Sequence, residues 1–217
     1  MSREMRRYVL LERDGVINRR LSAGYVKSWE DFEFLPRALD ALRLLAENDY
    51  GALVVSNQGC VGKGLLSLRE LQSMTRRFLL EVALAGGDIA KVYYCTHDPL
   101  DGCNCRKPEP GLLCRAMAEH AIRPMDTYVI AESESDMRAA SKAGCRGFLL
   151  RREAFLTTAV RSEGGPETAS NLYEAVEKIV RRISPTQAIV MQADWTAFDA
   201  ADPSANLFAR PRREPVA

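Results

Sequence analysis

The feature that most constrains the fold of this chain is a regular alternation between short apolar runs and longer segments with helical periodicity. Five runs of four or five mainly apolar residues cover positions 8–11, 52–56, 91–95, 127–131 and 147–150. Because consecutive positions are apolar, each run suits a strand that is buried on both faces. Strands that alternate with helices form parallel sheets with helices on both faces. The sequence therefore predicts an α/β fold with a doubly wound, Rossmann-like parallel sheet.

The intervening segments carry signals for helices. An apolar stripe at helical spacing predicts the first helix, and Ser67 followed by Glu70 forms a capping box that opens the second. Pro110 suits the first turn of a helix, and Gly144 suits the end of another. We expect helices around the stripe of Leu39, Leu42, Leu45 and Ala46, and over residues 67–85, 110–120, 135–143 and 171–183.

The composition narrows the class of protein. With 217 residues the chain can bury one good core. Its net charge of +1 argues against a broad nucleic-acid surface, and it has no run of about 18 apolar residues that would predict a membrane span. The first seven residues lack the apolar region of a signal peptide, so we expect a cytoplasmic protein, either a monomer or a weak dimer. In that compartment, the six cysteines are expected to be thiols or metal ligands rather than disulfides.

Residues 184–217 differ in composition from the rest of the chain. They are rich in Pro and Ala, and Trp195, Phe198 and Phe208 are scattered among them. The segment is either a mobile tail or one that binds a partner or a second copy of the chain. We therefore expect one domain over residues 1–183, followed by a C-terminal extension.

Polar residues follow the predicted strands at one end of the sheet. Glu12, Ser56, Cys95 and Glu132 each lie at or just beyond the end of an apolar run. In doubly wound sheets, ligands bind at the carboxyl ends of the strands. The sequence therefore predicts a ligand site at this edge of the sheet.

One loop gathers four potential metal ligands. Three thiols and an imidazole occur within eleven residues, and together they make a tetrahedral zinc set: Cys95, His97, Cys103 and Cys105. Four protein ligands leave no open position, so we expect a structural zinc ion that fixes the loop. The remaining cysteines at 114 and 145 are expected to be small core residues.

Residues 8–18, YVLLERDGVIN, resemble the first motif of the haloacid dehalogenase (HAD) phosphatases. In that family a hydrophobic strand precedes Asp-x-Asp-Gly. The first Asp attacks phosphorus, and the second transfers the proton of the leaving group. The resemblance implies that Glu12 takes the position of the nucleophile and that Asp14 is the acid and base. It covers about residues 8–183 and implies a HAD-like fold.

Two further stretches resemble the phosphate-binding motifs of this family. They are the turn after the second strand, SNQG, and the string CRKPEPG at residues 105–111. The first implies that Ser56 holds the phosphoryl group with its hydroxyl, while the second supplies Lys107 as the catalytic cation. The implied substrate-binding residues are Asn57, Gln58, Lys63 and Arg106, of which Arg106 would clamp a second phosphate.

The magnesium motif of the family is present in altered form. HAD phosphatases carry Gly-Asp followed by a second Asp, whereas this chain carries Ala131-Glu132 followed by Asp136. The resemblance implies that Mg²⁺ binds Glu12, Glu132 and the backbone carbonyl of Asp14, with Asp136 in support. Both aspartates that would face the metal are therefore glutamates here.

The zinc loop narrows the resemblance to one branch of the family. It is similar to the branch of the D-glycero-D-manno-heptose 1,7-bisphosphate phosphatases and histidinol-phosphate phosphatases, and residues 24–39 are similar to the substrate loop of the heptose enzymes. The reaction implied is hydrolysis of a small phosphorylated sugar, at the 7-phosphate of a heptose 1,7-bisphosphate.

The two glutamates leave two hypotheses open. Each carries an additional methylene, which displaces the carboxylate by roughly 1.5 Å, and a misplacement of about 1 Å can cost about a hundredfold in rate. Both changes nevertheless keep the negative charge. One hypothesis is a divergent phosphatase with altered turnover. The other is an inactive HAD homologue that binds a sugar phosphate or a protein partner.

Overall fold

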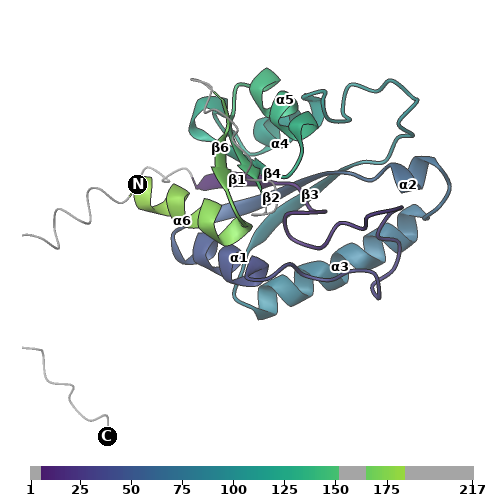
Figure 1. Cartoon of the computed structure of the whole chain (residues 1–217), viewed down its shortest axis with the longest axis horizontal. Coiled ribbons are helices and arrows are strands. Elements are labelled where there is room, and N and C mark those ends of the chain that lie inside the picture. Colours follow the sequence, from purple (N-terminus) through teal and green to yellow (C-terminus); the bar gives the residue numbers. More distant parts are fainter. Residues whose placement is uncertain (1–5, 152–164, 184–217) are drawn as a thin grey trace, which may run out of the picture. The chain divides into compact units, whose positions relative to one another are not determined.

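The computed structural model describes residues 6–151 and 165–183 (Figure 1). Its contacts divide the chain into two compact units, Met1–Val180 and Arg181–Ala217. The first unit contains the whole sheet, while the extension predicted at residues 184–217 lies outside the described residues. In the described part, no helix has the length and apolar character needed to cross a membrane.

The fold is built on a six-stranded sheet in the order β3-β2-β1-β4-β5-β6, in which every pairing is parallel. The strands are β1 (Arg7–Leu11), β2 (Tyr50–Asn57), β3 (Ile89–Cys95), β4 (Tyr128–Ala131), β5 (Arg146–Leu150) and β6 (Glu167–Ala169). The predicted α/β fold and its five strands are confirmed. The sixth strand, β6, was not predicted, because its three residues Glu-Thr-Ala form no apolar run.

Helices cover both faces of this sheet. They are α1 (Ala38–Glu47), α2 (Gly59–Gly62), α3 (Leu68–Leu84), α4 (Gly111–Glu119), the 3₁₀ helix η1 (Pro124–Asp126), α5 (Glu134–Lys142) and α6 (Leu172–Ile183). In Figure 1, α1, α3 and α6 lie on one side of the sheet, and α4 and α5 on the other. The capping box predicted at Ser67 and Glu70 is present at the start of α3. The short α2 and η1 were not predicted.

Two hydrophobic cores form on the two faces, and consecutive strand residues alternate between them. In β1, Val9 and Leu11 pack into the core under α1, α3 and α6, whereas Leu10 packs into the core under α4 and α5. All three side chains are fully buried. This is why the strands have consecutive apolar residues, since both faces of the sheet are covered.

The strand order determines where along the carboxyl edge of the sheet a ligand can bind. The chain moves from β1 outward to β2 and β3, and then returns to the other side of β1 with β4. In the register, Leu11 pairs with Ile130, and the next amide, that of Glu12, donates to the Ile130 carbonyl at 3.0 Å. The crevice at such a reversal is where ligands bind in doubly wound folds. Glu12 after β1 and Glu132 after β4 therefore lie on its two sides.

The start of α6 yields a prediction about pH and stability. Glu174 pairs with Lys178 at 2.6 Å and accepts from the Ser170 hydroxyl and amide, and these contacts lower its pKa to about 2. A lowered carboxyl pKa stabilises the fold above its unfolded value near 4.5, and that stability is lost as the pH falls towards about 2. We expect Glu174→Gln to reduce the free energy of unfolding by about 0.5 kcal/mol near neutral pH, given that the pair is partly exposed.

Urea unfolding of the two proteins at about pH 7 and about pH 3 would check this. The difference between native and variant should shrink at the lower pH. A difference independent of pH would mean that the charge of Glu174 does not matter.

Candidate active site and metal-binding loop

A cavity of about 400 Å³ lies at the carboxyl ends of β1 and β4. Its polar lining contains four acidic and three basic side chains, which are Glu12, Asp14, Glu132 and Asp136, and Arg20, Arg106 and Lys107. Carboxylates are ligands for hard divalent cations, and basic side chains can offset the charge of a transferring phosphoryl group. The lining therefore has the chemistry to hold a cation and a phosphate together.

At the floor of the cavity, Glu12 meets the two groups that were predicted to hold phosphate. Ser56 at the end of β2 donates its hydroxyl to Glu12 Oε1 at 2.5 Å, and Lys107 forms an ion pair with the other carboxylate oxygen. All three side chains are almost completely buried. The carboxylate of Glu12 is thus bound by a hydroxyl and an ammonium group that a phosphoryl oxygen could also use.

Lys107 is held by three oxygen partners. Besides Glu12, it pairs with Asp136 at 2.6 Å and donates to the Val55 carbonyl at 2.8 Å. Burial lowers the pKa of Lys107, although Asp136 beside it favours the charged form. Asn57 fixes the backbone of this residue, because its amide oxygen accepts from Lys107 N at 3.2 Å and its amide nitrogen donates to Lys107 O at 3.1 Å. The ammonium group therefore has a defined position over Glu12.

Asp14 lies beside Glu12 and is fixed by a separate set of donors. Arg13 donates from Nε at 3.0 Å, Asn18 from Nδ2 at 2.9 Å and Gln58 from Nε2 at 2.8 Å. Arg13 is only 1% exposed, so its charge is compensated by Asp14 in the interior. These donors fix the position of the Asp14 carboxylate in the cavity lining, which suits a group that transfers a proton.

Glu132 approaches from the other side of the crevice. Its Oε1 pairs with Arg20 Nη1 at 3.1 Å, and its carboxyl group packs on Gly15. A Cβ at position 15 would lie 1.9 Å from Glu132 Cδ, and Gly15 also has a positive φ of 87°. Only glycine suits both conditions. The turn after Asp14 is therefore shaped to bring the backbone and the Glu132 carboxylate together.

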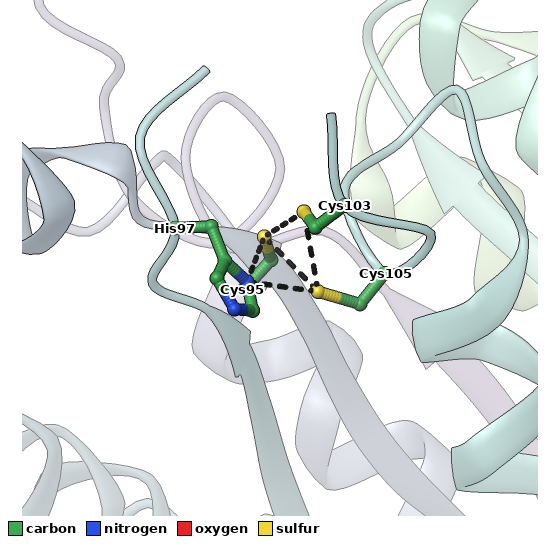
Figure 2. A group of neighbouring side chains, drawn as sticks. All are labelled: Cys95, His97, Cys103 and Cys105. Atoms are coloured by element: carbon green, nitrogen blue, oxygen red, sulfur yellow. Dashed lines mark hydrogen bonds between the residues drawn. The ribbon is translucent and has the colours of Figure 1, made fainter. Parts of the chain in front are cut away.

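The loop between β3 and α4 brings its four predicted ligands into one cluster (Figure 2). All ligand atoms of Cys95, His97, Cys103 and Cys105 lie within 4.8 Å of one another. The three sulfur–sulfur distances are 3.4 to 3.6 Å, close to the edge of about 3.8 Å expected for a tetrahedral zinc–thiolate site. In residues 6–151 and 165–183, this is the one group of three or more His, Cys, Asp or Glu side chains whose ligand atoms lie close enough together to share a metal ion.

The loop that carries the cluster of Cys95, His97, Cys103 and Cys105 packs against the turn that follows β2. A Cβ added to Gly62 would lie 2.2 Å from the amide nitrogen of Asp98, so the two backbones are in close contact. On its other side the loop runs directly into Arg106 and Lys107. The loop with the cluster therefore joins the turn after β2 to the segment that carries Arg106 and Lys107.

Comparison with known proteins identifies the family. A model of the HAD-hydrolase-like family matches residues 104–175. The chain is 34% identical over 176 residues to the D-glycero-beta-D-manno-heptose-1,7-bisphosphate 7-phosphatase of Pseudomonas putida, an alignment that covers 81% of this chain and 98% of the relative. The chain belongs to the HAD phosphatase family.

Two further comparisons support membership of this family. The chain is 37% identical over 133 residues to the D-glycero-alpha-D-manno-heptose-1,7-bisphosphate 7-phosphatase of Mycobacterium tuberculosis H37Rv, covering 61% of this chain and 70% of that protein. It also matches the crystal structure of the D,D-heptose 1,7-bisphosphate phosphatase of Bordetella bronchiseptica complexed with magnesium and phosphate. The TM-score is 0.75 at 27% identity, over 81% of this chain and 99% of that one.

The structure brings together most of the residues that the HAD resemblance singled out, with one exception. Ser56 and Gln58 lie directly behind the cavity, where Gln58 Nε2 also donates to the Ser56 hydroxyl at 3.0 Å. Lys63 does not line the cavity. It is exposed, and its ammonium group lies 5.6 Å from the centre of the Tyr25 ring. Because Tyr25 itself lines the cavity, Lys63 lies at the edge of the candidate site rather than in its lining.

Two other expectations need revision. Cys114 was predicted to be a core residue, but it is exposed on α4. Cys145 is only partly buried, against Met117. The prediction for Cys114 rested on the residue type alone, whereas α4 turns Leu112 and Leu113 toward the core and leaves position 114 outside it.

Three residues of the candidate site were not predicted from the sequence. Arg13 lies between the two motif carboxylates, Asn18 ends the first motif, and Arg20 follows it. Arg13 could have been predicted, because a charged residue between an apolar strand and a tight glycine turn is expected to be buried with a partner of opposite charge. Arg20 carried no such signal, because its partner is 112 positions away.

Proposed function

We propose that the chain is a metal-dependent phosphatase that removes the 7-phosphate of a heptose 1,7-bisphosphate. The observation that carries the proposal is the convergence of Glu12, Ser56 and Lys107 on one point of the cavity, with Asp14 beside them. Relatives that bear the name of this activity support the choice of substrate. Those relatives include both anomers, and we propose no preference between them.

In the proposed reaction, the Glu12 carboxylate attacks phosphorus and displaces the sugar oxygen, to which Asp14 gives a proton. Water then cleaves the acyl phosphate, and Asp14 takes a proton back. Ser56 and Lys107 hold the phosphoryl oxygens, while Arg106 faces the second phosphate of the substrate.

The oxygen-rich side of the cavity fits a magnesium ion. Glu12, Glu132 and the backbone carbonyl of Asp14 would supply hard oxygen ligands, and Asp136, which also lines the cavity, would support the site. When bound, Mg²⁺ would offset part of the negative charge on the phosphoryl group and the carboxylates.

We also propose that the Cys95, His97, Cys103 and Cys105 cluster holds a structural zinc ion. Its geometry suits tetrahedral coordination, and its chemistry suits zinc more than magnesium. We expect Cys105→Ser, or removal of zinc by a chelator, to lower the free energy of unfolding by about 4 kcal/mol when zinc is present at about a thousand times its dissociation constant.

Thermal unfolding together with elemental analysis of the purified protein would check this. Cys114→Ser is the matched control, because Cys114 is an exposed cysteine outside the cluster and its replacement should change neither quantity. Native protein without bound zinc would contradict the assignment.

One observation favours a second candidate function. The carboxylate of Glu12 already occupies both Ser56 and Lys107, so an incoming phosphate must compete with it. If that competition prevents attack, the chain is a HAD homologue that binds a phosphorylated sugar without hydrolysing it.

Phosphate release from heptose 1,7-bisphosphate with Mg²⁺ distinguishes the two functions. For a phosphatase, we expect release that requires Mg²⁺ and falls at least about a hundredfold in Asp14→Asn, because proton transfer contributes 10²- to 10⁴-fold in rate. Saturable binding of the bisphosphate without release would support the second function. Release that is unchanged in Asp14→Asn would contradict the proposed mechanism.

A further inference from the structure

We propose that Arg20 restrains Glu132 in the ligand-free protein, and that a substrate with a second phosphate draws Arg20 away and frees Glu132 to bind the divalent cation. This inference rests on the proposed function, and it adds a specificity role for a residue outside the catalytic set. Among the described residues, Arg20 is the only charged partner of Glu132, and the two side chains pair at 3.1 Å.

The Arg20–Glu132 pair lies next to the proposed magnesium position. Its carboxyl group packs on Gly15, next to the peptide whose carbonyl, that of Asp14, is a proposed magnesium ligand. Glu132 therefore already lies beside the proposed metal position, and the Arg20 guanidinium pairs with one of its carboxylate oxygens, Oε1. A cation that binds Glu132 must displace this positive charge or share the carboxylate with it.

Arg20 is suited to change partners. Its side chain is 63% exposed, whereas that of Glu132 is 22% exposed, and exposed ion pairs of this kind hold weakly. It also lines the cavity together with Arg106 and Lys107. A guanidinium group binds phosphate in a bidentate manner. A phosphate dianion at the cavity wall thus offers Arg20 a better partner than a single carboxylate.

The consequence is a coupling between two ligands. If the second phosphate removes Arg20 from Glu132, binding of the bisphosphate raises the affinity for Mg²⁺. By linkage, Mg²⁺ raises the affinity for the bisphosphate by the same factor. Inorganic phosphate brings only one phosphate group, which the proposed mechanism places at the reacting position, so we expect it not to produce the Arg20-dependent effect. The pair would then favour substrates with two phosphates over those with one.

The test is Mg²⁺ affinity, measured by calorimetry on the full chain. All proteins carry Asp14→Asn to prevent turnover, and each is titrated alone, with inorganic phosphate and with heptose 1,7-bisphosphate. Arg20→Ala should bind Mg²⁺ about fivefold more tightly than the parent in the absence of ligand, and it should lose the enhancement that the bisphosphate gives the parent.

Arg19→Ala is the matched control. Arg19 precedes Arg20 and pairs with Glu33 at 2.9 Å, where both side chains are 58% exposed, so its loss should leave Mg²⁺ affinity unchanged. A variant that merely disturbed the loop would bind Mg²⁺ less tightly, not more. The inference is overturned if Arg20→Ala leaves the affinity unchanged or lowers it, or if the parent binds no Mg²⁺.

The ligand-free titration requires no catalysis, which separates the two proposals. Tighter Mg²⁺ binding by Arg20→Ala, together with no release of phosphate by the native chain, would reject the phosphatase function and support the restraint of Glu132.

Discussion

Replacing Glu12 and Glu132 together by Asp is expected to raise the rate of phosphate release about a hundredfold. In-line attack requires reacting atoms about 3 to 3.5 Å apart, and an error of about 1 Å can cost about a hundredfold. The Glu12 carboxylate extends far enough to contact both Ser56 and Lys107, which are the groups proposed to hold phosphate. The shorter side chain should withdraw the carboxylate from that position and leave it in line for attack.

The single variants divide the effect between attack and metal binding. Glu12→Asp should mainly raise the maximal rate, and Glu132→Asp should mainly lower the Mg²⁺ concentration that gives half of that rate. Because the two side chains serve one reaction, their effects need not add. Glu47→Asp makes the same chemical change on an exposed side chain of α1 outside the cavity, and it should have no effect. A double variant slower than the native chain would mean that the glutamates are a working adaptation of this site.

Replacing Lys107 by Met is expected to reduce phosphate release by about two to three orders of magnitude and to destabilise the fold. Loss of one charge-stabilising donor in an active site costs about 10²- to 10³-fold in rate. Lys107 is also the buried cation between Glu12 and Asp136, and its replacement by Met leaves these two carboxylates without their shared positive partner. Breaking a buried ion pair in this way costs about 3 to 5 kcal/mol.

Steady-state kinetics and urea unfolding measure the two effects separately. Lys63→Met is the matched control, because that lysine is exposed and lies outside the cavity. It should change neither the rate nor the free energy of unfolding. If Lys63→Met reduced the rate as much as Lys107→Met, the glycine-rich turn would have to close over the substrate in a way that this structure does not show.

Much of the fold follows from local patterns in the sequence. The five predicted strands are apolar on consecutive positions because both faces of the sheet are covered, so the same pattern that identified them also predicted the layers. The capping box at Ser67 and Glu70 is purely local, and it is present as predicted. The three-residue β6 was missed because it adds to the sheet edge through pairing with β5, and pairing of that kind leaves no local signal.

In the candidate site, the sequence predicted which residues gather but not all of the contacts between them. Strand ends predicted which residues gather at the edge of the sheet, and the metal-ligand spacing predicted the cysteine and histidine cluster. Neither could predict that Lys63 would point toward Tyr25, since this depends on how the turn enters α2. The pairing of Arg20 with Glu132 depends on the approach of two distant loops, and it appears only when the fold is assembled.

The measurement that tests the central proposal most directly is ³¹P NMR of heptose 1,7-bisphosphate incubated with the native chain and Mg²⁺, alongside the Glu12→Asp/Glu132→Asp variant. We predict that the signal of the 7-phosphate disappears while that of the 1-phosphate remains, slowly with the native chain and about a hundredfold faster with the variant. If both phosphate signals persist with both proteins, the proposed substrate and reaction are wrong.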